Sequence, residues 1–240
     1  MTTTKGAKLT TVGFMMPPEF PAEAYDEVHS RLVKYKETHP IQWESFGLGW
    51  NGLAYRYRAL AEYDEEFTAS IMVSTSPAPE ERYRQGKALF GFFVNAVSVI
   101  DCFFYSANCI ASILKPNIFP LSKSEDLIIY PEKVKQRFAA EFSNDPLSNA
   151  MSLCVGNCLY KKMKPIRDVL THRGAPPRKF YAGGDRDGLA TMPNNVKAPV
   201  NQWQFDFAVD TGTTASRREW LSRILKDLIE AANEFCNREL

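Results

Sequence analysis

The stretch from Ala88 to Leu114, ALFGFFVNAVSVIDCFFYSANCIASIL, decides the fold class. It runs for 27 mostly apolar residues between Lys87 and Lys115. Its polar members recur every three or four residues, a spacing that places them in one stripe along a helix. They are Asn95, Ser98, Asp101, Tyr105, Asn108 and Ser112. The spacing predicts a long central helix whose polar stripe faces polar partners on neighbouring helices.

The same stretch is long enough to cross a bilayer, and its charge argues against that interpretation. An uncompensated Asp101 near the middle of a lone span would be costly in hydrocarbon. Residues 1–20 contain no apolar run long enough for a signal peptide, and we expect them to form a flexible arm. The sequence therefore predicts a cytoplasmic protein with no membrane partner.

Helical periodicity continues on both sides of the central segment. It predicts helices over residues 21–36, 43–72 and 131–142, with Asp145 capping a further segment that reaches His172. Pro165 should kink or divide that segment near residues 162–164. Ser216 and Glu219 form a capping box at the start of a last amphipathic helix. We expect a mainly all-α helical bundle, with residues 21–240 forming a single domain.

Residues 175–212 lose the helical period and accumulate Gly, Pro, Asn and Asp. Within this insertion, Trp203, Phe205, Phe207 and Val209 alternate with less apolar residues, which predicts a half-buried strand. A turn at Asn194–Asn195 would precede it. A small hairpin on the helical body is the expected result.

The charge of the chain is nearly balanced, at +1 overall. Such a balance excludes proteins that coat nucleic acid or lipid through a broad basic surface. However, residues 161–179 carry seven basic residues and one acidic residue, a net +6, which leaves −5 for the rest. Because arginine grips phosphate oxygens in a bidentate fork, this segment suits a phosphate-bearing ligand. Lys164, Arg178 and Lys179 are its candidate phosphate-binding residues.

The cysteines indicate free thiols rather than disulfides or a metal centre. They are five, an odd number, and most lie in apolar segments, which is typical of a reducing compartment. Cys154 and Cys158 would supply half a zinc site on one helix face, but no second pair or neighbouring histidine completes it. We predict no metal and no cofactor.

His172 is the strongest candidate for chemistry, because the common hydrolase, nucleotide-loop and zinc-protease motifs are missing from the sequence. Asp168 lies four residues before it, on the same helix face, where its carboxylate would orient the imidazole. Arg167 lies five residues before it, about 140° around an ideal helix. The two converge only at a helix end, in a distorted turn or across two subunits. The alternative is that a helix C-terminus simply attracts basic residues through its dipole.

RDVLTH, from Arg167 to His172, resembles the R-x4-H motif of HEPN (higher eukaryotes and prokaryotes nucleotide-binding) domains, and its helical context resembles uncharacterised bacterial HEPN-like proteins. The resemblance implies an all-α bundle and a metal-independent ribonuclease that acts as a homodimer. Arg167 would hold the scissile phosphate, and His172 would move protons so that the 2′-hydroxyl attacks and leaves a 2′,3′-cyclic phosphate. The family most often has Asn after the arginine. Here Asp168 follows, and its carboxylate would either tune His172 or repel phosphate.

The polar stripe on the central helix gains a role from this resemblance. Asp101 would pair with Arg167 or Arg173, and Asn95 or Tyr105 would hydrogen-bond into the same site. Alternatively, the stripe only satisfies buried polar groups between helices. Two other functions stay open: a non-catalytic module of the same fold that binds RNA, a nucleotide or a protein partner, and a purely structural protein.

Overall fold

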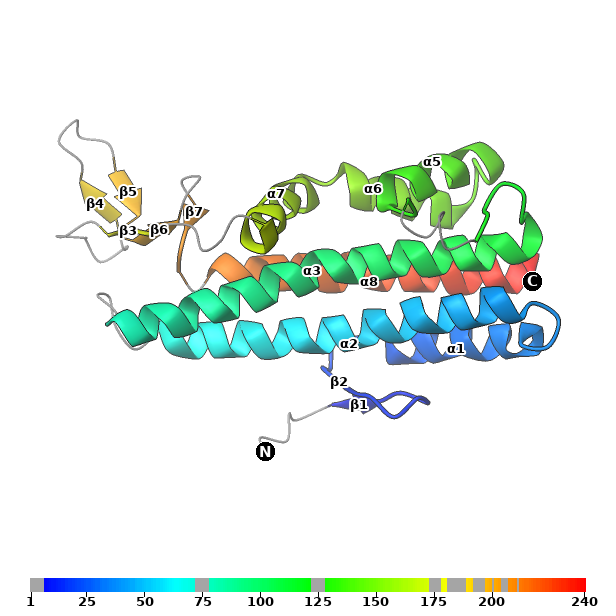
Figure 1. Ribbon diagram of the computed structural model, residues 1–240, viewed down its shortest axis with the longest axis horizontal. Coiled ribbons are helices and arrows are strands. Elements are labelled where there is room, and N and C mark those ends of the chain that lie inside the picture. The colour runs from blue at the N-terminus through cyan, green and yellow to red at the C-terminus, as the bar shows by residue number, and fades with distance from the viewer. Residues whose placement is uncertain are drawn as a thin grey trace.

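The computed structural model describes residues 7–71, 78–121, 128–172, 178–180, 189–191, 197–199, 201–203, 207–210 and 212–240. Long helices form its body: α1 (Ala22–Leu32), α2 (Pro40–Ile71), α3 (Pro79–Leu114) and α8 (Gly212–Glu239), with a 3-10 turn, η1 (Val33–Tyr35), between the first two. Three shorter helices, α5 (Pro131–Glu141), α6 (Pro146–Gly156) and α7 (Cys158–His172), lie along one side of α3 and α8 (Figure 1). The predicted all-α bundle is confirmed.

The central helix α3 is the predicted one, extended at its N-terminal end to Pro79. Glu81 accepts a hydrogen bond from the Ala78 amide at 2.9 Å, which supports this early start. Among the described residues, α3 is the one helix long and apolar enough to cross a membrane, and 67% of its most apolar window is buried inside the bundle. Its apolar faces therefore pack against α2, α5, α7 and α8.

Helix α2 packs closely along α3 because Gly49, which has no side chain, lies at the contact. A Cβ added at Gly49 would collide with the hydroxyl of Ser106 and lie 2.8 Å from a ring carbon of Tyr105. At Gly47, two residues earlier, a Cβ would meet open space. Glycine lowers the helix propensity of this segment, but at Gly49 it permits α2 and α3 to approach each other closely.

Alanine substitutions at these two glycines should have opposite effects. Gly47→Ala should raise the free energy of unfolding by about 0.5–1 kcal/mol, because glycine loses more backbone entropy in a helix. Gly49→Ala should lower it by about 1–3 kcal/mol through overpacking against α3. Urea denaturation of both variants measures the difference. Equal stabilisation by both would contradict the close approach of α2 and α3.

The last helix, α8, begins earlier than its sequence pattern indicates. It starts at Gly212, and the predicted capping box is wrong because the Ser216 hydroxyl donates to the Gly212 carbonyl within the helix. Asp210 and Thr213 hold the start instead: the Asp210 amide donates to the Thr213 hydroxyl at 2.8 Å. The apolar face of α8, from Leu221 to Phe235, is buried in the core as predicted.

The segment from Asp145 to His172 divides at a different place from the one predicted. Asp145 caps α6 as expected, accepting from the Leu147 amide at 2.7 Å. The break near residues 162–164 is wrong, because α6 ends at Gly156 and Pro165 lies inside α7. The Asn157 side chain accepts from the Leu159 amide at 2.8 Å and so caps a new helix. A local side-chain cap therefore decides the boundary rather than the proline.

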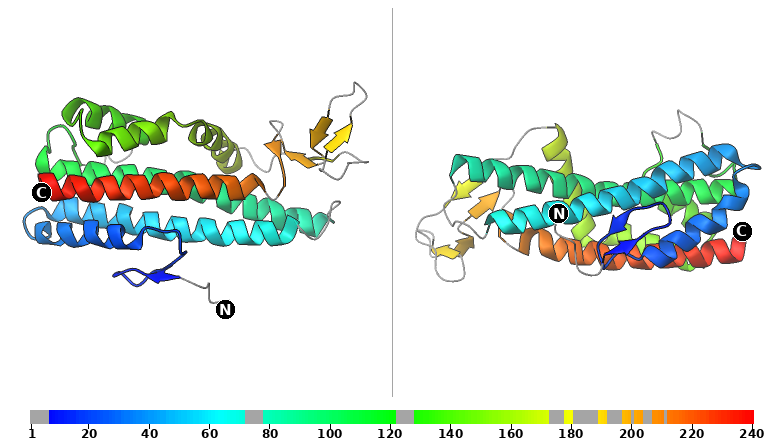
Figure 2. Two further views of the ribbon diagram at one scale, coloured as in Figure 1. Left: turned by 180° about the vertical axis from the view of Figure 1, so that it is seen from behind. Right: turned by 90° about the horizontal axis from the view of Figure 1, so that it is seen from below.

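The expected flexible arm is wrong for residues 7–20. Strands β1 (Lys8–Leu9) and β2 (Met15–Met16) pair antiparallel, and Phe20 is fully buried. The Thr11 amide donates to both carboxylate oxygens of Asp26 in α1, at 3.1 and 3.0 Å. Figure 2 shows this hairpin lying across the α1–α2 side of the bundle. Residues 1–6 lie outside the described part.

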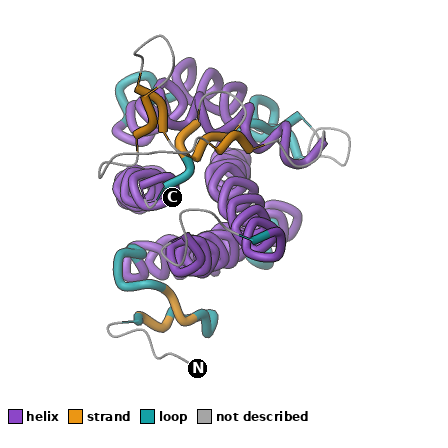
Figure 3. The backbone as a smooth tube through the Cα atoms, turned by 90° about the vertical axis from the view of Figure 1, so that its left-hand side faces the viewer, coloured by secondary structure: helices purple, strands orange, loops and turns teal. Residues whose placement is uncertain are grey.

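The predicted insertion contains short antiparallel strands. They are β3 (Arg178–Phe180), β4 (Leu189–Thr191), β5 (Lys197–Pro199), β6 (Asn201–Trp203) and β7 (Phe207–Ala208), paired as β3-β6-β7 and β4-β5. The single strand expected from Trp203 to Val209 is wrong, because β6 and β7 are separate strands with Trp203 opposite Phe207. Phe205, Asn194 and Asn195 lie outside the described residues. In the end-on view of Figure 3, these strands overlap the upper helices, whereas the N-terminal pair lies below all the helices.

Candidate functional site

Helix α7 presents one polar stripe to the bundle. Tyr160, Lys164 and Arg167 are spaced by four and three residues, so they share a helix face. Tyr160 is 1% exposed, whereas the side chain of Arg167 is 22% exposed. This stripe faces α3 and α5, and it places charged groups between three helices.

Arg167 is held by two carboxylates. Its Nη1 atom lies 3.5 Å from Oδ2 of Asp101 on α3, and its Nε atom donates to Oδ1 of Asp168 at 2.7 Å. The predicted pairing of Asp101 with Arg167 is thus present, while Arg173 lies outside the described residues. The guanidinium is therefore tied to the central helix at one end and to its own helix at the other.

Two further residues of this cluster, Glu132 and Tyr160, were not anticipated from the sequence. Lys164, expected to bind phosphate, donates to Glu132 of α5 at 3.1 Å. Burial raises the pKa of the Asp101 carboxyl, and the cations Arg167 and Lys164 partly offset that rise. Burial also raises the pKa of Tyr160, and the negative charges of Asp101 and Glu132 add to the effect. The spacing of Tyr160, Lys164 and Arg167 was the available signal for the cluster.

His172 is the last residue of α7 and is exposed. Within the described part of the chain, its ring has no hydrogen-bond or ion-pair partner, because the nearby Asp168 carboxylate binds Arg167 instead. The expected orientation of the imidazole by Asp168 is therefore not the arrangement present. At the exposed end of the helix, the imidazole is accessible to a ligand.

Asn95 and Tyr105 do not join this cluster, because both face α2. Asn95 accepts from Arg56 at 3.3 Å and donates to the Gly91 carbonyl at 2.7 Å. Tyr105 lies against Gly49. The polar positions of α3 are spaced by fewer than 3.6 residues on average, so over their length the stripe winds about 100° around the helix. Its members consequently meet different neighbours.

Arg178 and Lys179 belong to β3, where they pair with Trp203 and Gln202 of β6. Their side chains lie outside the described part of the structure, so their contact with phosphate stays a prediction. Lys161 and Lys162 are exposed on α7. These two lysines make the outer surface of this helix positively charged.

The structure separates the two cysteines that were weighed as half a zinc site. Cys154 is buried in α6, where burial raises its pKa to about 12, and Cys158 is the exposed first residue of α7. Among the residues with a described position, no three His, Cys, Asp or Glu side chains gather in a way that could hold a metal ion.

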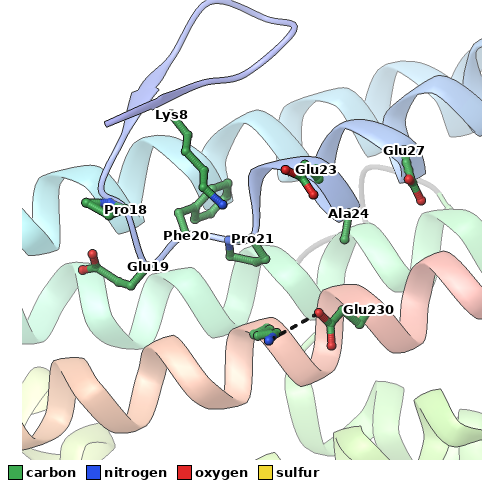
Figure 4. Close-up of a pocket in the computed structure, with 10 residues that line it drawn as sticks. Lys8, Pro18, Glu19, Phe20, Pro21, Glu23, Ala24, Glu27 and Glu230 are labelled. Atoms are coloured by element: carbon green, nitrogen blue, oxygen red, sulfur yellow. Dashed lines mark ion pairs between the residues drawn. The ribbon is translucent and has the colours of Figure 1, made fainter. Parts of the chain in front are cut away.

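A cleft of about 410 Å³ lies between the N-terminal segment, α1 and α8, on the far side of the bundle from α7. Figure 4 shows Glu23 and Glu27 of α1 and Glu230 of α8 around it. Most of its carboxylates have internal partners: Glu19 binds Arg218, Glu27 accepts from Asn233, and Glu230 lies 3.8 Å from Lys226. The cleft therefore takes no part in the α7 cluster.

Comparisons with known proteins identify no relative. No family model matches the chain, and no curated protein or solved structure matches it. The likeness of the Arg167–His172 segment to HEPN domains rests on the motif and on the helical architecture around it.

Proposed function

We propose that the chain is an HEPN-like, metal-independent endoribonuclease with Arg167 and His172 as its catalytic residues. One observation carries the proposal. Arg167 is tethered to the long central helix through Asp101, while His172, at the end of the same short helix, is exposed and has no partner among the described residues. Arg167 is thus held in position to bind a phosphate, and His172 is accessible for the proton transfer that the reaction requires.

RNA binding would begin when a phosphate of the RNA replaces the Asp168 carboxylate as the partner of Arg167. Half of the Asp168 side chain is exposed, and ion pairs of this kind contribute little to stability. A phosphate can therefore replace the Asp168 carboxylate on Arg167. Asp101, on the opposite side of the guanidinium, keeps it oriented. In this role Asp101 is a positioning residue.

Cleavage then needs one base and one acid. His172 takes the proton of the ribose 2′-hydroxyl as the 2′-oxygen forms a bond to phosphorus. The bond from phosphorus to the 5′-oxygen breaks, and the imidazolium returns a proton to that leaving oxygen. The products are a 2′,3′-cyclic phosphate and a 5′-hydroxyl. Arg167 stabilises the charge that develops on the phosphoryl oxygens.

A second copy of the chain completes the site in this proposal. Arg167 and His172 point about 140° apart on an ideal helix, so one α7 does not direct both at one phosphate. Two α7 helices that meet at a two-fold axis bring the arginine of one subunit to the histidine of the other. The active species in this proposal is therefore a homodimer.

RNA cleavage in the presence of a chelator tests the activity. Wild type should release fragments with cyclic phosphate ends, and Arg167→Ala and His172→Ala should each slow cleavage by about 10²-fold or more. His39→Ala serves as the matched control, because His39 lies at the start of α2 and should leave the rate unchanged. Cleavage that survives in His172→Ala would identify a contaminating nuclease.

The engagement of Arg167 by two carboxylates favours one alternative, a non-catalytic protein that binds RNA or a nucleotide. Intact RNA with wild type, together with binding that weakens as salt rises, would establish this alternative over the enzyme. If neither RNA nor nucleotides shift the melting temperature, a structural role becomes the best interpretation.

A further inference from the structure

One face of α3 runs the length of the bundle and meets a different neighbour at each level. Tyr83, Phe90, Asp101 and Asn108 lie within about 20° of one another on an ideal helix. Arg137 of α5 donates to Asn108 at 3.0 Å, and Arg167 of α7 pairs with Asp101. The layer of α5, α6 and α7 thus covers this face from Asn108 to Asp101.

Beyond α7, the described part of the same face carries two exposed aromatic side chains. Tyr83 is 65% exposed and Phe90 is 43% exposed. Helical rise places Phe90 about 16 Å and Tyr83 about 27 Å from Asp101 along the axis. Single exposed aromatic residues are ordinary on protein surfaces, but these two lie on one line along α3 that points toward Asp101 and the proposed catalytic arginine, and we call this line the path.

Exposed cations flank the two aromatic rings. Lys87 lies between them and its Nζ atom is 3.3 Å from Glu66, while Arg84 is 3.7 Å from Glu80. More than half of each cationic side chain is exposed, so these pairs are weak and a phosphate can compete for the cations. Aromatic faces bordered by such cations are the features with which proteins hold unpaired bases and their backbone.

We propose that Tyr83 and Phe90 form a stacking platform for single-stranded RNA, which leads the strand to Arg167 and His172. The proposal rests on the proposed function and adds a substrate class to it. Bases in an A-form duplex are stacked inside the helix and cannot lie on a protein ring, whereas unpaired bases can. The enzyme therefore selects single strands.

Binding to the His172→Ala protein tests the platform without cleavage. Tyr83→Ala and Phe90→Ala, each in that background, should raise the Kd for a single-stranded oligoribonucleotide by about 5-fold or more, the loss expected for one stacked base. The Kd for a duplex of the same sequence should not change. Tyr55→Ala is the matched control, since Tyr55 is 60% exposed on α2 and lies outside the path.

The outcomes separate the platform from the catalytic proposal. Unchanged Kd for both variants, in a wild-type protein that cleaves RNA, would overturn the platform and leave the ribonuclease standing. An equal loss in Tyr55→Ala would also overturn it. A change in sedimentation instead of RNA affinity would identify the surface as a protein interface. Failure of every protein to bind RNA would remove both proposals together. Because both side chains are exposed, the variants should melt as the parent does.

Discussion

Replacing Trp50 with alanine is expected to lower the free energy of unfolding by about 3–5 kcal/mol, the usual cost of truncating a buried aromatic side chain. Trp50 is fully buried, and its ring stacks on Tyr25 at a centroid distance of 5.0 Å. The two residues also exchange hydrogen bonds: each side chain donates to the backbone carbonyl of the other, at 3.1 Å. The substitution leaves a cavity and removes the hydrogen bond from the indole to the Tyr25 carbonyl.

Denaturation in guanidinium chloride measures this effect. Leu48→Ala is the control, because Leu48 lies on the same helix and is 75% exposed, so its loss should change stability by less than about 0.5 kcal/mol. Equal destabilisation by the two variants would mean that Trp50 is not in the core and that α2 has a different rotation about its axis.

Removal of the Arg218 side chain should destabilise the protein by about 3–5 kcal/mol, because it leaves a buried carboxylate without its cation. Arg218 of α8 donates to Asp64 of α2 at 3.0 Å and to Glu19 of the N-terminal segment at 2.7 Å. Asp64 is only 7% exposed, and its second carboxylate oxygen has no partner among the described residues. Arg218→Ala therefore leaves the Asp64 carboxylate buried inside the bundle without its arginine partner.

A second substitution distinguishes that cause from simple loss of packing. Asp64→Asn, added to Arg218→Ala, removes the stranded charge and should recover part of the lost stability. Arg223→Ala, at an exposed position on the same helix, should have little effect. If Asp64→Asn further weakens the Arg218→Ala protein, the destabilisation comes from the lost arginine stem rather than from the charge.

The helices were predictable where apolar periodicity was long. Leu221, Leu225 and Phe235 show the 3.6-residue repeat clearly, and the burial of one helix face follows from it. Boundaries set by single side chains were not predictable in this way. Asn157 follows the end of one helix and caps the next through one hydrogen bond. In the sequence, Pro165 is the more obvious helix breaker, so the boundary was predicted near it instead. The N-terminal segment is held by separate contacts of Thr11, Glu19 and Phe20 that follow no sequence repeat.

The candidate site was predictable only in part, for a similar reason. Opposite charges made Asp101 and Arg167 natural partners, and the structure pairs them. Asn95 and Tyr105 shared the same polar stripe, but the winding of that stripe turns them toward α2. Glu132 of α5 joins the cluster through its hydrogen bond from Lys164 of α7, which no local pattern revealed. Which helix faces meet is a property of the whole bundle.

The position of α8 has a consequence for the order in which the protein folds during synthesis. Arg31 of α1 binds Asn233 of α8 across 202 residues of sequence. The apolar side chains that α1, α2 and α3 turn toward α8 are therefore made long before their cover. Until α8 leaves the ribosome, these helices expose a surface that chaperones recognise and that aggregation exploits. The nascent chain should therefore depend on chaperones most after α3 has emerged and before α8 is free to dock.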